Sequence, residues 1–242
     1  TAVNLSALLG AMGQRVLMID LDPQGNTTSG LGMEVDDKSI YEVIMGRMKL
    51  TDVMEETEFK NLFIAGSDVR LANAELELVE VEKREYRLKT AVQSVQQDFD
   101  FIFIDCPPSL GLLTINALGA ADSVLIPIQC EYYALEGVAS LMNTISRVKK
   151  TINPHLEIEG VLLTMLDGRT NLGLQVVDEV KKHFKKQVYA TVIPRSVRLG
   201  EAPSHGEPIH VYDKRSAGCV AYVNLAKEVL KRNNIKVKEF KL

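Results

Sequence analysis

Long apolar runs and closely spaced cysteines are both missing from this sequence. No stretch of the 242 residues approaches the length of a membrane-spanning helix, and no charged-then-apolar segment at the start has the form of a secretion signal. The three cysteines, Cys106, Cys130 and Cys219, lie far apart without a Cys-x-x-Cys motif. This spacing argues against a disulfide framework, a zinc site and an iron-sulfur cluster. We therefore expect a cytoplasmic protein.

The composition is that of one globular domain with a large core. Hydrophobic residues make up 46% of the chain and charged residues 25%, which argues against disorder and against a fibrous repeat. No linker and no internal repeat interrupts the sequence. We therefore predict a single domain over residues 1–242.

Short apolar runs alternate with helix-type patterns along the whole chain. Such runs are typical of parallel strands that are covered on both faces, and the alternation predicts an α/β fold with a doubly wound, mostly parallel sheet and helices on both faces. The predicted strands are 15–22, 62–65, 101–105, 123–129, 158–166 and 188–193. The predicted helices are 2–13, 39–46, 52–56, 70–97 as one helix or two, 112–121, 135–152, 172–184 and 217–232. A segment punctuated by Pro and Gly, 194–208, separates the last strand from the last helix.

Carboxylates follow two of the predicted strands directly. The apolar run 16–19 ends in Asp20 and Asp22, and the run that begins at Phe101 ends in Asp105. In open α/β sheets the carboxyl ends of the strands form the edge at which ligands bind. Two buried strands that each end in Asp therefore predict one shared polar site. The alternative for any single Asp at such a position is a helix cap or a turn former.

The small net charge of −4 conceals an asymmetry along the chain. Residues 1–162 hold 13 basic and 24 acidic side chains, whereas residues 163–242 hold 15 and 8. The two parts therefore carry net charges of about −11 and about +7. A basic C-terminal third is typical of a face that binds polyanions, although solvated helix surfaces also carry such an excess.

Several long motifs occur in an order that resembles one known family. They are DLDPQGNTTSGLG at 20–32, FIFIDCPPSLGLLTINAL at 101–118, IPIQCEYYALEG at 126–137, VLLTMLDGRTNLG at 161–173 and VIPRSVRLGEAPSHGEPI at 192–209. Together they resemble the ParA/Soj chromosome-partitioning ATPases, which belong to the deviant Walker A class of P-loop proteins and are related to MinD. The resemblance covers essentially the whole chain.

The resemblance implies an ATP and Mg²⁺ site built from the strand ends. Asp22 would position or activate the attacking water, Asp105 would hold Mg²⁺ through its water shell, and Asp20 would support the same cluster. Phosphoryl transfer needs a positioned water and a bound Mg²⁺, and carboxylates can orient the water and hold the ion. The residues that the resemblance places around the nucleotide are Gly25 and Asn26 in a first switch loop, Pro108 in a second switch, and Pro194 at the adenine base. From the residues alone, Gly25 and Asn26 fit a plain turn equally well.

The resemblance also implies ATP-dependent, sequence-independent DNA binding. Arg169 and Arg198 match positions that contact DNA in the family, and Arg195 extends the same basic face. Phosphate backbones are bound by Arg and Lys without base readout. The neighbouring lysines at 181, 182, 185 and 186 end a helix, where a cationic surface also favours the helix dipole.

The segment that binds phosphate in this family is not in the sequence. The family carries a Lys-Gly-Gly-Val-Gly-Lys-Thr-type loop between its first strand and first helix, whereas this chain starts at Thr1, directly in the helical pattern. We expect a strand and this loop upstream of Thr1, so that residues 1–242 are an N-terminally truncated domain. By themselves they are expected to bind and hydrolyse ATP poorly and to leave two neighbouring strands with unpaired edges.

For the intact protein, the resemblance implies a cycle in chromosome or plasmid partitioning. ATP would join two subunits into a homodimer, the dimer would bind DNA nonspecifically on the nucleoid, and a ParB-like centromere-binding partner would stimulate the hydrolysis that releases it. One alternative is a MinD-like membrane-cycling ATPase. That reading needs an amphipathic membrane helix, and the tail at 233–242 has few large apolar residues in helical register, so no stable membrane association is expected. The other alternative is a non-hydrolysing DNA-binding scaffold without a phosphate loop.

Overall fold

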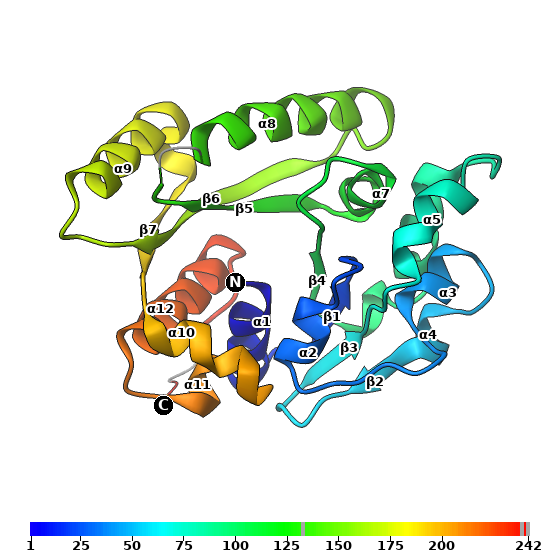
Figure 1. Ribbon diagram of the computed structural model, residues 1–242, viewed down its shortest axis with the longest axis horizontal. Coiled ribbons are helices and arrows are strands. Elements are labelled where there is room, and N and C mark those ends of the chain that lie inside the picture. The colour runs from blue at the N-terminus through cyan, green and yellow to red at the C-terminus, as the bar shows by residue number, and fades with distance from the viewer. Residues whose placement is uncertain (132–133, 238–239, 241–242) are drawn as a thin grey trace.

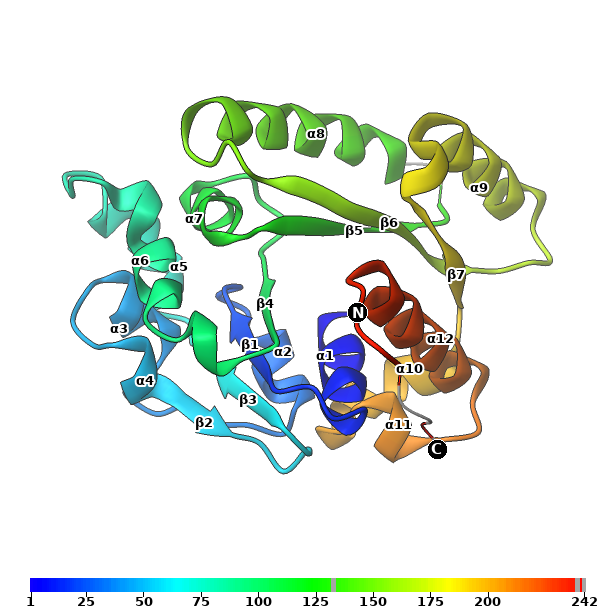
Figure 2. The same ribbon diagram turned by 180° about the vertical axis from the view of Figure 1, so that it is seen from behind.

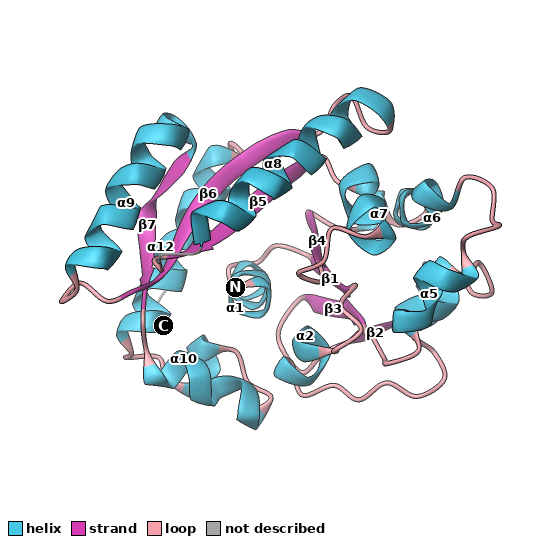
Figure 3. Cartoon of the chain, turned by 45° about the horizontal axis from the view of Figure 1, so that its top comes forward, coloured by secondary structure: helices cyan, strands magenta, loops and turns pink. Residues whose placement is uncertain are grey.

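The computed structural model describes residues 1–131, 134–237 and 240 (Figure 1). Within these residues the strands form two separate sheets, one of four strands in the order β2-β3-β1-β4 and one of three strands in the order β5-β6-β7. Figure 3 shows the two sheets with their helices in a view from the top. The α/β architecture and the mostly parallel pairing follow the prediction.

The four-stranded sheet contains the first buried strand of the chain. β1 (Val16–Asp20) pairs in parallel with β3 (Leu62–Ala65) on one side and with β4 (Phe101–Asp105) on the other. Every residue of β1 is buried, as expected for an apolar strand inside a sheet that is covered on both faces. β2 (Met54–Glu56) is an antiparallel edge strand. The prediction of a helix at 52–56 is therefore wrong for its second half, since the helix α4 (Leu50–Val53) ends where β2 begins.

The three-stranded sheet is entirely parallel. Its strands are β5 (Ser123–Gln129), β6 (Glu157–Leu166) and β7 (Val188–Pro194). The helices α8 (Ala134–Thr151) and α9 (Asn171–Phe184) lie over its outer face (Figures 1 and 2). On the inner side, α12 (Ala217–Arg232) contacts both β7 and α1 (Ala2–Ala11).

No strand pairing joins the two sheets within the described part of the chain. β4 is the last strand of one sheet and β5 is the first strand of the other. Among the described residues, each of the two strands is paired on one side only. Unpaired strand edges expose donors and acceptors that can pair with a further strand.

The helix α1 packs beneath this junction and joins the two halves of the molecule. Leu5, Leu8 and Leu9 on α1 are at most 1% exposed, and they share one apolar cluster with Met18 of β1 and Leu225 of α12. Burying large aliphatic side chains stabilises a fold by about 1.5 to 3 kcal/mol each. α1 therefore fixes β1 relative to α12 through its core contacts.

The remaining helices are short. They are α2 (Asn26–Gly30), α3 (Ile40–Ile44), α5 (Leu71–Glu77), α6 (Arg87–Gln93), α7 (Leu112–Ala120), α10 (Val197–Glu201) and α11 (Ile209–Tyr212), with a 3-10 turn η4 (Ala202–His205) between the last two. The stretch 70–97 thus holds two helices, α5 and α6. The segment 194–208, for which no helix was predicted, contains α10 and η4.

Candidate functional site

Three carboxylates meet at the carboxyl edge of the four-stranded sheet. Asp20 ends β1 and Asp105 ends β4, and the two residues are partners in the parallel register. The backbone N–H of Asp22 donates to Asp20 Oδ1 at 3.2 Å, and Asp22 Oδ1 accepts from the backbone N–H of Gln24 at 3.0 Å. The structure therefore brings together the three acids that the strand ends predict. Asp22 forms an Asx turn, which keeps it next to the sheet edge.

Asp20 holds neighbouring segments in place. Its side chain is completely buried, and Oδ2 accepts from both the backbone N–H of Thr28, at 2.8 Å, and Thr28 Oγ1, at 2.7 Å. Burial raises the pKa of Asp20, while these hydrogen bonds act in the opposite direction. Thr28 Oγ1 accepts in turn from the backbone N–H of Ser67, at 3.0 Å. Asp20 and Thr28 thus connect β1 to the loop that follows β3.

Asp105 is bound to the segment that follows Asp22. Its Oδ2 accepts from Thr27 Oγ1 at 2.6 Å, and Thr27 is buried. This hydrogen bond ties the end of β4 to the first turn of α2.

The donor set fits a magnesium ion held through water. Carboxylate and hydroxyl oxygens are the ligands that Mg²⁺ prefers, and Mg²⁺ usually keeps several of its waters. Among the residues that the structure describes, no group of three or more His, Cys, Asp or Glu side chains is arranged to enclose a metal directly. Asp105 and Thr27, whose side chains are hydrogen-bonded to each other, supply a carboxylate and a hydroxyl oxygen at this edge, so the donor types fit the ion.

The segment at Gly25 and Asn26, which the resemblance predicts as a first switch loop, differs from a plain loop. Gly25 has a left-handed backbone with φ of 63°, which Gly adopts without strain, and it caps α2. Asn26 is the first residue of that helix and is exposed. The reversal at Gly25 turns the chain back so that Thr27 and Thr28 reach the two aspartates. Neither threonine was predicted as a site residue, although a Thr pair one residue after Asp-Pro-x-Gly was a visible signal.

The segment 106–111, which the resemblance predicts as a second switch, lies between β4 and α7. Pro108 is exposed in this loop. Glu75 of α5 reaches it, because Glu75 Oε1 accepts from the backbone N–H of Leu113 in the first turn of α7 at 3.2 Å. A Cβ at Gly111 would overlap the Glu75 carboxylate. The hydrogen bond between Glu75 and Leu113 therefore depends on Gly at position 111. The adjacent Cys106 is no reactive thiol, since burial and Asp105 raise its pKa to about 12.

The first switch segment contacts the loop after the last strand through two glycines. Gly32 and Gly206 have φ of 68° and 66°, and a Cβ built on Gly206 would lie 2.6 Å from Gly32 Cα. Neither backbone has room for a side chain there. This contact joins the end of α2 to η4. No local pattern in the sequence indicates it.

Pro194 ends β7 beside the three predicted DNA contacts. It lines an open groove between β7 and α12 together with Thr191, Val220 and Asn224. The backbone N–H of Arg195 donates to the carbonyl oxygen of Leu166 at the end of β6, at 3.0 Å. Because of this bond, Arg195 lies next to the loop that carries Arg169.

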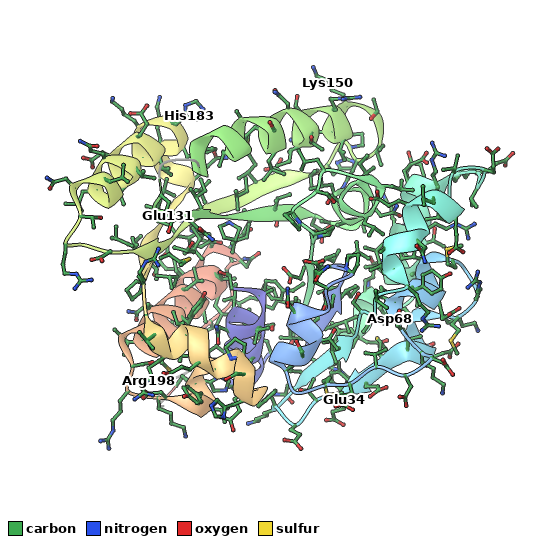
Figure 4. The ribbon with its side chains drawn as sticks, in the orientation of Figure 1. Glu34, Asp68, Glu131, Lys150, His183 and Arg198 are labelled. Carbon is green, nitrogen blue, oxygen red and sulfur yellow. The ribbon has the colours of Figure 1, made fainter. Side chains whose placement is uncertain are left out.

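All three predicted arginines are exposed and form ion pairs. The side chain of Arg169 is 89% exposed and binds Asp167 at 2.7 Å, and Arg195 pairs with Glu131. Arg198 on α10 binds Glu201 at 2.9 Å and Asp213 at 3.5 Å. Figure 4 shows Arg198 and Glu131 on the same side of the molecule. The Arg169 guanidinium lowers the pKa of Asp167 to about 2, so this pair is ionised at neutral pH.

Among the helices of the described residues, none combines the length and the apolar character needed to cross a bilayer. The expectation for the C-terminal tail concerns residues 233–242, of which 238–239 and 241–242 lie outside the described residues.

Comparison with known proteins places this site in a family. A family model described as "AAA domain" matches residues 1–158. The sporulation initiation inhibitor protein Soj of Bacillus subtilis is 58% identical over 231 residues, which are 95% of this chain and 91% of Soj. The chromosome partitioning protein ParA of Myxococcus xanthus is 50% identical, with 98% of this chain and 84% of ParA covered.

Solved structures share the fold over nearly the full chain. Cobyrinic acid a,c-diamide synthase from Mycobacterium smegmatis, with bound ADP and magnesium, is 35% identical with a TM-score of 0.82, covering 96% of this chain and 90% of that one. The septum site-determining protein MinD of Pyrococcus horikoshii, complexed with Mg-ADP, is 25% identical with a TM-score of 0.79, covering 94% and 88%. MinD is therefore the more distant relation, and the identity to Soj and ParA shows that this chain belongs to the ParA/Soj family of chromosome-partitioning ATPases.

Proposed function

We propose that the full-length protein binds ATP with Mg²⁺ at the carboxyl edge of the four-stranded sheet and hydrolyses it. The observation that carries this proposal is the convergence of Asp20, Asp22 and Asp105 at the ends of paired strands. Asp105 and Thr27 would hold the hydrated Mg²⁺, which neutralises charge on the phosphates when bound. Asp22 would orient or deprotonate the attacking water, because its carboxylate lies beyond the strand end and is partly exposed.

The proposal includes a strand and a phosphate-binding loop upstream of Thr1. Such a strand would pair with the unpaired edges of β4 and β5, and the loop would then lead into α1. Without these parts we expect residues 1–242 to bind ATP weakly. A strand added at this position would join the two sheets into one.

The proposed role of this activity is partitioning of a chromosome or plasmid. ATP would stabilise a homodimer, which binds DNA without sequence preference through Arg169, Arg195 and Arg198. A ParB-like centromere-binding partner would stimulate hydrolysis and so release the DNA. The names of the Soj and ParA relatives support this role, and the exposed arginines at the ends of β6 and β7 support the DNA contact.

Substitution of Asp22 tests the catalytic assignment. In the full-length protein, D22A should lower ATP turnover by at least about 100-fold, because a positioned water and base commonly contribute that much, while ATP-dependent DNA binding persists. Asp178→Ala removes an exposed carboxylate on α9 and should leave turnover unchanged. Unaltered turnover in D22A would exclude the proposed role of Asp22. DNA binding that is indifferent to ATP in the wild-type protein would instead favour the scaffold alternative, and binding to liposomes in preference to DNA would favour the MinD-like one.

A further inference from the structure

The segment 197–213 carries Arg198 and contacts both α1 and α2. It contains α10, η4 and α11, and Figures 1 and 2 show α11 beside α1. The backbone of Gly206 lies against the backbone of Gly32 at the end of α2. At α1, the side chain of Asn4 binds the backbone of Ile209. The segment is therefore attached to the two helices that adjoin the proposed nucleotide site.

The contact at Asn4 satisfies a backbone donor that α11 itself cannot satisfy. Asn4 lies in the first turn of α1, and its Oδ1 accepts from the N–H of Ile209 at 2.7 Å. Ile209 is the first residue of α11, and the first N–H groups of a helix have no partner within it. Ile209 is 0% exposed and shares an apolar cluster with Leu5 and Leu8 of α1. The start of α11 is thus fixed to α1 by a hydrogen bond and by packing.

Three consecutive interactions lead from Asn4 to the guanidinium group of Arg198. The first is the hydrogen bond from the Ile209 N–H to Asn4. In the second, the carbonyl oxygen of Ile209 accepts from the N–H of Asp213, directly after α11, at 2.9 Å. In the third, Asp213 Oδ2 binds Arg198 Nε at 3.5 Å. A displacement of α11 therefore moves a carboxylate that holds Arg198.

A parallel route passes through Tyr212, the last residue of α11. Its hydroxyl group donates to Glu201 Oε2 at 3.1 Å, and the same oxygen accepts from Arg198 Nη1 at 2.9 Å. The Tyr212 ring stacks on the ring of His205, with centroids 5.0 Å apart. Arg198 is thus held by two carboxylates, although its side chain is 56% exposed. Holding a long side chain in place in advance lowers the entropy cost of binding.

We propose that Asn4 is a positioning residue for the DNA contact at Arg198. The proposal rests on the proposed function, in which the phosphate-binding loop leads into α1 and Arg198 binds the DNA backbone. The Asn4 bond makes the placement of α11, and hence of Arg198, depend on the first turn of α1. Arg169 pairs with Asp167 in the loop after β6, and none of these interactions involves that pair. Its DNA contact should therefore not depend on Asn4.

A double-mutant cycle in the full-length protein tests this dependence. Binding of a fluorescent DNA duplex of arbitrary sequence is followed by anisotropy, with saturating ATP and Mg²⁺, over a range of salt concentrations. Each lost phosphate contact should reduce the slope of log K against log salt by about 0.9, and the affinity by roughly fivefold or more at about 0.1 M salt. A partly folded sample would instead bind with lower amplitude and an unchanged slope.

Asn4→Leu removes the acceptor and keeps the size of the side chain. N4L and R198A should each show the loss of affinity and of slope, because both variants lack a correctly placed guanidinium group. The double variant N4L/R198A should bind no more weakly than R198A. In an R169A background, N4L should lower the affinity by the full factor that it shows alone.

Two further variants serve as controls. N4D keeps an acceptor oxygen on a side chain of the same shape, so its DNA affinity should stay within about twofold of the wild-type value. Asn61→Gly removes a hydrogen bond at the other end of α1, where Asn61 Nδ2 donates to the Gly10 carbonyl at 3.2 Å. Gly readily adopts the left-handed backbone of residue 61. N61G should therefore leave DNA binding unchanged.

Three results would overturn the role of Asn4 while R198A still weakens DNA binding. They are wild-type affinity in N4L, an equal further loss when N4L is added to R198A and to R169A, and a loss in N61G as large as that in N4L. Unchanged DNA affinity in both R198A and R169A would instead refute the DNA contacts of the proposed function, and the role of Asn4 with them. ATP turnover of the same samples reports separately on the proposed catalytic role.

Discussion

At the scale of single residues, Thr28 is the residue that hydrogen-bonds both the end of β1 and the loop after β3. It is 4% exposed, donates twice to Asp20 and accepts from Ser67. Removing its hydroxyl leaves the buried Asp20 carboxylate with fewer donors and the Ser67 N–H without this acceptor. Leaving a buried polar group unsatisfied costs about 1 to 3 kcal/mol.

Thr28→Val should therefore lower the free energy of unfolding by about 2 to 3 kcal/mol. Val keeps the shape of Thr but lacks the hydroxyl, so packing is little changed. Thr90→Val, at an exposed site on α6, should change stability by less than about 0.5 kcal/mol. Urea unfolding of both variants measures the difference, and equal effects would contradict the connecting role of Thr28.

A second residue-scale prediction concerns pH. His210 Nδ1 is buried without a hydrogen-bond partner among the described residues, and burial, assisted by Lys214, lowers the pKa of His210 to about 4. The unfolded chain takes up this proton near pH 6.5. Stability should therefore fall as the pH drops from about 6.5 toward 4, because the unfolded state binds the proton first.

His210→Gln removes this titration. Relative to the variant, the wild-type protein should lose about 2 kcal/mol of stability between pH 7 and pH 4.5, allowing for partial exposure of the ring. The exposed His155→Gln is the control and should follow the wild-type curve. Parallel curves for the wild-type protein and H210Q in urea unfolding would refute the assignment.

At the scale of elements, the contact between α2 and η4 leaves no room for a side chain at Gly206. Gly206→Ala should cost about 2 to 4 kcal/mol, because the methyl group meets the Gly32 backbone and the residue keeps a positive φ. Gly200→Ala places a methyl group in open space on helix α10 and should be neutral or slightly stabilising. Thermal unfolding compares the two.

Gly13→Ala separates the two causes of this loss. Gly13 has φ of 95°, but nothing lies within 4 Å of a Cβ built there. Its substitution therefore measures backbone strain alone, and the excess cost of Gly206→Ala measures the close approach to Gly32. If Gly13→Ala costs as much as Gly206→Ala, the contact between α2 and η4 contributes nothing of its own.

At the scale of the whole molecule, the sequence was informative where short apolar runs mark strands. β3, β4 and β5 follow the predicted bounds to the residue, because apolar runs of this length between polar residues are typical of parallel strands. The short helices α2 and α10 were not predicted, because five residues are too few to show a helical pattern of apolar positions. Their positions also depend on tertiary contacts. Asp20 and Asp105 were found from the strand ends, whereas the Gly32 and Gly206 contact joins positions that no local pattern relates.

The ion pairs of the exposed arginines also affect how the protein approaches a polyanion. Each of the three guanidinium groups is paired with a carboxylate of the protein. At long range these ion pairs act as dipoles, which attract a polyanion only weakly. Charges separated by more than about 8 to 10 Å are screened at physiological ionic strength. In the proposed complex with DNA, these arginines would therefore add little long-range steering. Residence time would then depend on how readily phosphate replaces Asp167, Glu131 and Glu201, so that a carboxylate exchange would set the rate of dissociation.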